Sequence, residues 1–168
     1  MDGPEMVVRT VQVPSNIYIE TLANIIMLAF GRSDIPDNYW FEANKKRHMP
    51  YYENYEHKDE TFELEDTYGM TIGDLLSKKG TIMFFNILDK KGNVKWKHAI
   101  IMEKSGRYTD KSTHYIELID GRGGYPSKNT KDMNDFLARH KEGKVQVPDS
   151  KAIRKKIENF EMETGKPC

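Results

Sequence analysis

Two segments with the strongest strand character, on either side of a short polar loop, constrain the fold most. Thr81–Leu88 and Val94–Glu103 are rich in β-branched and aromatic residues. The five residues between them, Asp89–Asn93, are of the kinds that form turns. The pattern therefore predicts an antiparallel hairpin, and apolar residues on both faces of its first strand favour a central place in a sheet.

A symmetric loop would fix the register of this hairpin. It pairs three residues of the first strand with three of the second: Leu88 with Val94, Asn86 with Trp96, and Phe84 with His98. Trp96 and His98 then share one face, because side chains alternate along a strand.

The rest of the chain supplies further strands and several helices. Strands are predicted at Met6–Val13, at Asn38–Glu42, within the acidic stretch Glu53–Asp66, and at His114–Asp120. Helical spacing predicts a long helix at Ile17–Phe30, a brief one opened by Thr71 and Asp74, one after Pro126, and a last one at Ser150–Glu163 ending at Gly165. We therefore expect one α+β domain over residues 1–168, with a mainly antiparallel sheet of five or six strands. One long N-terminal helix and two C-terminal helices should pack on it.

Composition narrows the class of protein. The 26 basic residues balance the 26 acidic ones, so no global field draws the chain to nucleic acid or an anionic membrane, and any such contact must be local. The single cysteine, Cys168, excludes an internal disulfide. No signal peptide or membrane-length apolar run is present, so we expect a cytoplasmic protein without a membrane partner.

One candidate for chemistry is His98. It could act as a base or ligand in a small polar pocket beside Trp96, with Asp89 or Asp120 as its acidic neighbour. The alternative is an aromatic pair that covers the sheet, and this is favoured because no nucleophile with an orienting partner can be assigned. The five histidines form no close pair, so neither a metal site nor a cofactor is expected. The glycine-rich Gly121–Gly124 lacks a phosphate-binding pattern and predicts a turn.

A second candidate is a basic, aromatic surface. Lys90, Lys91 and Lys95 cluster with Lys97 at the hairpin, and a second basic group, Lys45 to Arg47, follows the aromatic residues Tyr39 and Trp40. Such a surface, with Trp96, could hold nucleic acid through phosphate contacts and base stacking, and a protein partner is also possible there. The alternative is solvated lysines that protect the strands, or that pair with the acidic stretch.

Four runs taken in order resemble the plasmid pRiA4b ORF-3-like family. They are VQVPSNIYIETLANIIMLAFG, TIGDLLSKKGTIMFFNILD, WKHAIIMEK and LIDGRGGYP. The resemblance covers about Val7–Leu137 and leaves the last helix, about residues 150–163, as a C-terminal extension. It implies an α+β fold in a family found in bacteria and archaea, often on plasmids or beside insertion-sequence genes, with an essentially uncharacterised role.

Several acidic motifs of that family are altered here. Where the family has Asp-Phe-Gly-Asp before Trp-x-His, this chain reads Asp89-Lys-Lys-Gly-Asn93, although Trp96 and His98 are retained. If those carboxylates serve a shared activity, this chain lacks it.

The missing catalytic constellation, and a family that travels with mobile elements, favour a noncatalytic binding or accessory module. The alternative function is a hydrolase that uses His98 with an acidic neighbour.

Overall fold

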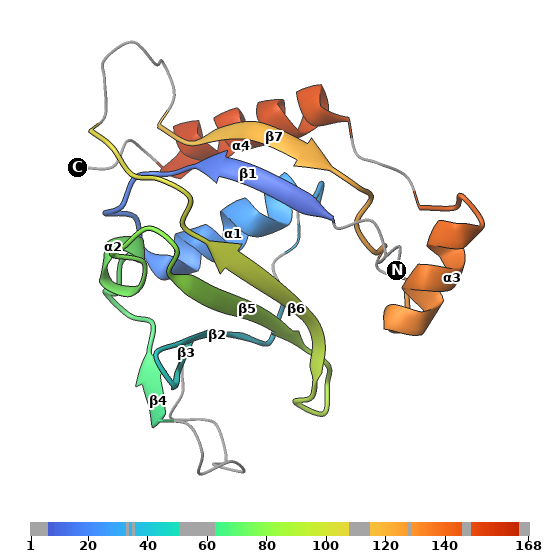
Figure 1. Cartoon of the computed structure of the whole chain (residues 1–168), viewed down its shortest axis with the longest axis horizontal. Helices are drawn as coiled ribbons and strands as arrows, with labels where there is room; N and C mark the ends of the chain where they lie inside the picture. The colour runs from blue at the N-terminus through green and yellow to red at the C-terminus, as the bar shows by residue number, and fades with distance from the viewer. Residues whose placement is uncertain are drawn as a thin grey trace. The chain divides into compact units, whose positions relative to one another are not determined.

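A computed structural model describes seven stretches of the chain: residues 7–32, 34, 36–50, 63–107, 115–127, 129–145 and 149–164, with side chains as far as residue 161. Within them the fold is α+β, as predicted (Figure 1). It has four helices and seven strands, where the sequence predicted five or six strands. The acidic segment 53–62, the start of the predicted His114 strand and the helix stop at Gly165 lie outside the described residues. The chain gathers into two compact units, and the expectation of one domain stays a prediction.

The first unit, here called the sheet unit, comprises Ser15–Ala23 and Ile35–Asp110. Its five strands lie in the order β4-β3-β2-β5-β6. They are β2 (Tyr39–Ala43), β3 (Lys46–Met49), β4 (Glu63–Asp66), β5 (Ile82–Leu88) and β6 (Val94–Ile101). All neighbours are antiparallel except β3 and β4, which run parallel. The predicted mainly antiparallel sheet is therefore confirmed.

Strand β3 was not predicted. It follows β2 through a two-residue turn in which Asn44 and Lys45 both have positive φ, at 52° and 63°. Two such residues define the type I′ turn that matches the twist of a hairpin. Asparagine tolerates this backbone and lysine does not favour it, so only Asn44 carried a signal in the sequence.

The inner face of this sheet forms an aromatic core. Phe41 and Phe85 are fully buried, and their ring centroids lie 4.9 Å apart. Tyr39 packs on Phe85 at 5.5 Å and is itself 9% exposed. The short helix α2 (Ile72–Leu75) is opened as predicted, because the backbone nitrogen and hydroxyl of Thr71 both donate to the Asp74 carboxylate, at 2.8 and 2.9 Å.

The second unit, here called the helical unit, comprises Met1–Pro14, Asn24–Asp34 and Lys111–Cys168. Its two strands, β1 (Val8–Gln12) and β7 (Glu117–Arg122), pair antiparallel with each other in a sheet of their own. The strands thus form two sheets, where the sequence predicted one. Helix α1 (Ile19–Ala29) begins in the sheet unit and ends in this one, and the last two helices are α3 (Met133–Lys141) and α4 (Ser150–Thr164).

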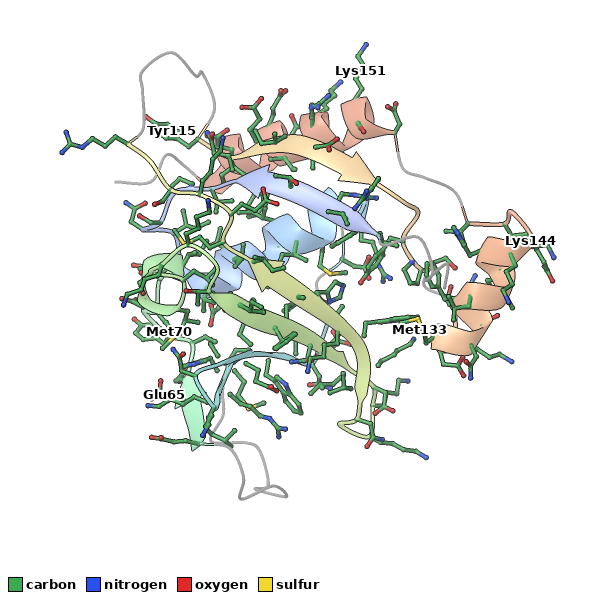
Figure 2. All side chains as sticks on the ribbon, viewed as in Figure 1. Glu65, Met70, Tyr115, Met133, Lys144 and Lys151 are labelled. Atoms are coloured by element: carbon green, nitrogen blue, oxygen red, sulfur yellow. The ribbon has the colours of Figure 1, made fainter. Side chains whose placement is uncertain are left out.

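Helix α4 docks on strand β7. Its apolar stripe turns inward, with Ile153 3% and Ile157 1% exposed. Arg154 Nε donates to the main-chain oxygen of Leu118 at 3.2 Å. On the outer side, Lys151 points away from β7 (Figure 2). The amphipathic pattern of this helix is therefore accounted for within its own unit.

Candidate functional site

The hairpin of β5 and β6 has a bulge that changes the predicted register. Leu88 faces Val94 as expected, but Trp96 faces Ile87 and His98 faces Phe85. The prediction of Asn86 and Phe84 as their partners was wrong, because one extra residue of β6 enters beside Leu88 and shifts every later pair by one position. Trp96 and His98 therefore lie on the inner face with the aromatic core.

Asp89 organises the loop of this hairpin. Its Oδ1 accepts hydrogen bonds from the backbone nitrogens of Lys91, at 2.8 Å, and Asn93, at 2.9 Å. The Asn93 bond is the main reason why the pKa of Asp89 is lowered, with the Lys91 backbone and charge adding to it. Asp89 is thus held ionised as part of the turn.

His98 is surrounded by groups of the core. Its Nδ1 lies 3.1 Å from the carbonyl oxygen of Phe85, whose ring centroid is 5.4 Å from the imidazole centroid. Burial lowers the pKa of His98 and so favours its neutral form. Asp89 lies four residues along β5 from Phe85, about 13 Å at the usual rise per residue. Asp120 belongs to the helical unit, where it accepts a hydrogen bond from the Gly121 nitrogen at 2.8 Å. The structure therefore does not join His98 to Asp89, and a catalytic role for these three residues stays a prediction.

The opposite face of the sheet, here called the outer face, carries cations over aromatic rings. Lys97 Nζ lies 4.0 Å from the centroid of Phe84, and the Arg47 guanidinium carbon lies 4.4 Å from that of Trp40. Both contacts are within the range of cation–π attraction. Trp40 is only 7% exposed and packs in a small cluster with Met49 and Leu88.

Three lysines surround the hairpin loop in solvent. Lys90 and Lys91 lie in the loop and Lys95 at the bulge, and all three are exposed. Within the part of the chain that the structure describes, none of them forms an ion pair. Of the predicted binding residues, these lysines are accessible, whereas Trp96 and Tyr39 are 8% and 9% exposed on the inner face.

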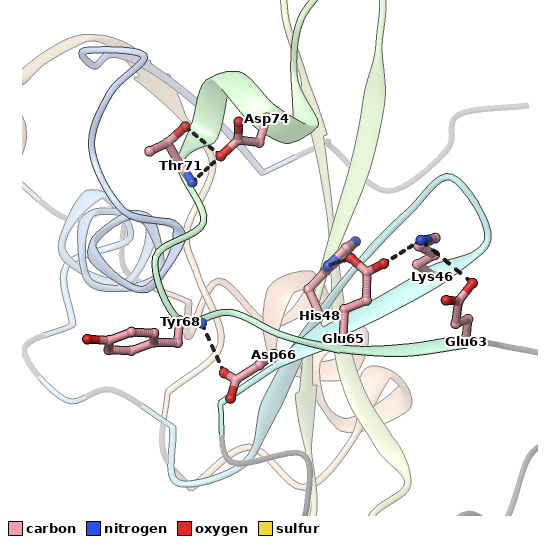
Figure 3. A network of polar contacts seen from close by, with 8 residues as sticks. All are labelled: Lys46, His48, Glu63, Glu65, Asp66, Tyr68, Thr71 and Asp74. Carbon is pink, nitrogen blue, oxygen red and sulfur yellow. Dashed lines mark hydrogen bonds and ion pairs between the residues drawn. The ribbon is translucent and has the colours of Figure 1, made fainter.

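Lysine behaves differently at the other edge of the sheet. Lys46 on β3 pairs with Glu65 and, at 3.6 Å, with Glu63 on the neighbouring strand (Figure 3). Glu63 and Glu65 belong to the acidic stretch, so the predicted pairing of basic residues with that stretch is confirmed at Lys46.

A pair formed by a buried histidine and a partly exposed glutamate was missed at the same edge. His48 is 2% exposed, and its Nδ1 lies 3.4 Å from Glu65 Oε2 (Figure 3). Burial lowers the pKa of His48 and outweighs the opposing effect of the Glu65 charge. Both imidazole nitrogens are closed to solvent and make no hydrogen bond. The pair is therefore placed to affect stability, and finding it would have required predicting β3.

The described residues contain neither a metal-binding cluster nor a membrane-spanning helix. Across residues 7–164, apart from the undescribed gaps, no three histidine, cysteine, aspartate or glutamate side chains are placed to hold a metal ion. No described helix has both the length and the apolar character needed to cross a bilayer.

Comparison with known proteins identifies relatives of uncharacterised role. A family model described as plasmid pRiA4b ORF-3-like protein matches residues 2–163. The match reaches beyond the expected residues 7–137 and includes nearly all of α4. No curated protein matches the chain. A crystal structure of a protein of unknown function, MM3350 from Methanosarcina mazei Go1, matches with a TM-score of 0.64 and 14% identity over 99% of this chain and 86% of that one. At that identity the likeness extends to the fold alone.

Proposed function

The chain belongs to the plasmid pRiA4b ORF-3-like family, and from that premise we propose that it is a noncatalytic module that binds nucleic acid through its β5–β6 hairpin. The observation that carries the proposal is the set of three exposed lysines, Lys90, Lys91 and Lys95, which form no ion pair with any described residue. Exposed lysines without an ion pair can bind phosphates and release the counterions of the nucleic acid.

The contrast with Lys46 supports this proposal. Lys46 is neutralised by carboxylates of the neighbouring strand, as the solvated-surface alternative requires. At the hairpin the loop carries one carboxylate, Asp89, whose charge acts on Lys91 but is outnumbered by the three lysines. A local positive charge therefore remains on a chain with no net charge, and a local contact is the kind that such a chain can make.

Salt dependence of binding tests the proposal. Affinity for a fluorescent single-stranded oligonucleotide would be measured by anisotropy between about 50 and 200 mM salt. In the K90Q/K91Q/K95Q variant the slope of log K against log salt should fall by roughly 2, at about 0.7 per lost phosphate contact.

The K151Q/K155Q/K156Q variant provides a matched control. It removes the same charge from exposed positions on α4 and should keep the wild-type slope. Equal slopes for the two triple variants, or no binding by the wild-type protein, would overturn the proposal.

A further inference from the structure

The outer face of β5 and β6 combines apolar surface with a movable cation. Three cross-strand pairs lie on it: Ile82 with Ile101, Phe84 with Ala99, and Asn86 with Lys97. Ile82 is 51% and Ile101 56% exposed, Ala99 and Lys97 are also exposed, and Phe84 is half-buried. Two exposed isoleucines beside a half-buried phenylalanine are unusual on a sheet whose other face is already the core.

Lys97 suggests the charge of the missing occupant. It lies directly opposite Asn86, yet its ammonium reaches diagonally over the Phe84 ring at 4.0 Å. An anionic group beside the sheet would draw this flexible side chain away from the ring and free the aromatic face. The hairpin lysines continue the positive charge along the same two strands. One carboxylate, Glu42, lies opposite Phe84 and beside Arg47, and the cations outnumber it. The surface is therefore complementary to a ligand that is both anionic and flat-ringed.

Asn86 gives a second sign of an absent partner. Its side chain is 1% exposed, and its amide nitrogen is buried without a hydrogen-bond acceptor among the described residues. The indole nitrogen of Trp40, which lies opposite Asn86 on β2, is also buried without a hydrogen-bond acceptor among the described residues. Buried donors are nearly always paired, because an unmet one costs about 1–3 kcal/mol. Because both nitrogens are closed to solvent, a carbonyl or phosphate oxygen on this face would reach them only after neighbouring side chains move.

We propose that this outer face, centred on Phe84, Asn86 and Lys97, is a stacking platform for single-stranded nucleic acid. A base stacks on Phe84, Lys97 moves to a phosphate, and Asn86 donates to an oxygen of the strand. Bases in a duplex are stacked on one another and cannot offer their faces to a protein ring, which selects an unpaired strand. The proposal rests on the proposed function and specifies the ligand of the same hairpin.

The experiment compares an unpaired strand with a duplex. An oligothymidine of about 16 nucleotides and its duplex with oligoadenosine would be titrated by anisotropy into the full chain. The single strand should bind at least tenfold more tightly. The F84L variant, which keeps the apolar volume but loses the ring, should weaken single-strand binding roughly tenfold, the usual loss for one stacked base.

Two further variants assign this loss to the platform. Y68L removes a ring that is 89% exposed after β4, at the opposite edge of the sheet, and should bind as the wild type does. K97Q should lower the salt slope by about 0.7, as one phosphate contact does. F84L should leave that slope unchanged, because it removes no charge. Far-UV circular dichroism would check that each variant is folded.

Each other outcome overturns the inference in a recognisable way. Equal affinity for duplex and single strand, with the K90Q/K91Q/K95Q effect intact, would sink the platform but leave the proposed function standing. If the wild-type protein bound neither oligonucleotide, both the platform and the proposed function would be wrong. A concentration-dependent dimer in sedimentation that Ile101→Glu dissociates would show that the face binds a second copy instead.

Discussion

The Arg9 guanidinium joins β1 to the end of helix α1, because its Nε donates to the main-chain oxygen of Ala29 at 2.8 Å. Its other nitrogens donate to main-chain oxygens of Arg122, at 2.6 Å, and of Gly123, at 2.9 Å. The guanidinium also lies 5.1 Å from the ring centroid of Phe30. One side chain thus holds three segments of the helical unit together and places a positive charge at a helix C-terminus.

Replacing Arg9 by methionine should therefore destabilise the protein. Several carbonyl oxygens would lose a charged donor, and we expect the free energy of unfolding to fall by about 2 kcal/mol. Urea unfolding measures the change. The control is Arg9→Lys, which keeps the charge but not the planar fork, and it should recover less than half of the loss. Full recovery by lysine would mean that charge alone matters here.

Gly121 should be coupled to Arg9. A Cβ atom at Gly121 would come within 2.9 Å of Arg9 Cδ, and that side chain is held in place by its hydrogen bonds. Gly121→Ala should therefore cost about 1–2 kcal/mol in the wild type and much less in the Arg9→Met background. A double-mutant cycle measures this coupling, and additive effects would contradict it.

Helices and strands were predicted from the sequence more accurately than the register in which the strands pair. The β5–β6 hairpin was visible because its strands are rich in core-forming residues, and α4 because its stripe of isoleucines repeats at helical spacing. The bulge beside Leu88 was not visible, since loop composition does not show which strand carries an extra residue. That single residue moved Trp96 and His98 to the inner face, so the predicted polar pocket was misplaced.

Strand β3 was missed for a different reason. Its sequence, Lys46 to Met49, has none of the usual apolar alternation, and its two buried residues are Met49 and His48, the latter paired with Glu65. Polar residues become compatible with a sheet interior only through such partners, which lie far away in the sequence. The exposure of the hairpin lysines was easier to predict from the sequence, because lysine is rarely buried.

Replacing Lys45 by glycine should stabilise the protein. It occupies a turn position with φ of 63°, which costs a residue with a Cβ atom about 1 kcal/mol. Lys45→Gly creates the Asn-Gly pair favoured in type I′ turns and should raise stability by roughly 0.5–1 kcal/mol. Thermal melting measures the gain. Asn44→Gly should gain less, because asparagine already tolerates this backbone, and a lower melting temperature for Lys45→Gly would contradict the turn assignment.

His48 should make stability depend on pH below neutrality. Burial holds its pKa below the ordinary value of 6.5 in the folded chain. Between the two pKa values the unfolded state binds more protons, so stability is complete above about pH 6.5 and is lost as pH falls toward the folded pKa. Each such histidine contributes at most about 1.4 kcal/mol per pH unit.

His98 should contribute to the pH dependence of stability in the same direction as His48, because burial also lowers its pKa. Urea unfolding between pH 7 and about pH 5, above the range where carboxylates titrate, would measure the slope. We expect His48→Gln and His98→Gln each to reduce it. An unchanged slope in His48→Gln would show that folding does not shift the pKa of this imidazole.

Helix α4 provides the last test, since its docking is internal to the helical unit. Ile157 is 1% exposed and lies on the side of α4 that faces β7, so Ile157→Asp would bury a charge without a partner. Such a group costs about 3 kcal/mol or more, which corresponds to a fall in melting temperature of roughly 10 °C. Lys156→Asp, an exposed neighbour on the same helix, should change stability by less than about 1 kcal/mol. Differential scanning calorimetry and sedimentation of both variants separate the possibilities, because an internally docked helix loses stability without any change in oligomeric state. A normal melting temperature together with dissociation of an oligomer would instead place the Ile157 face against a second subunit.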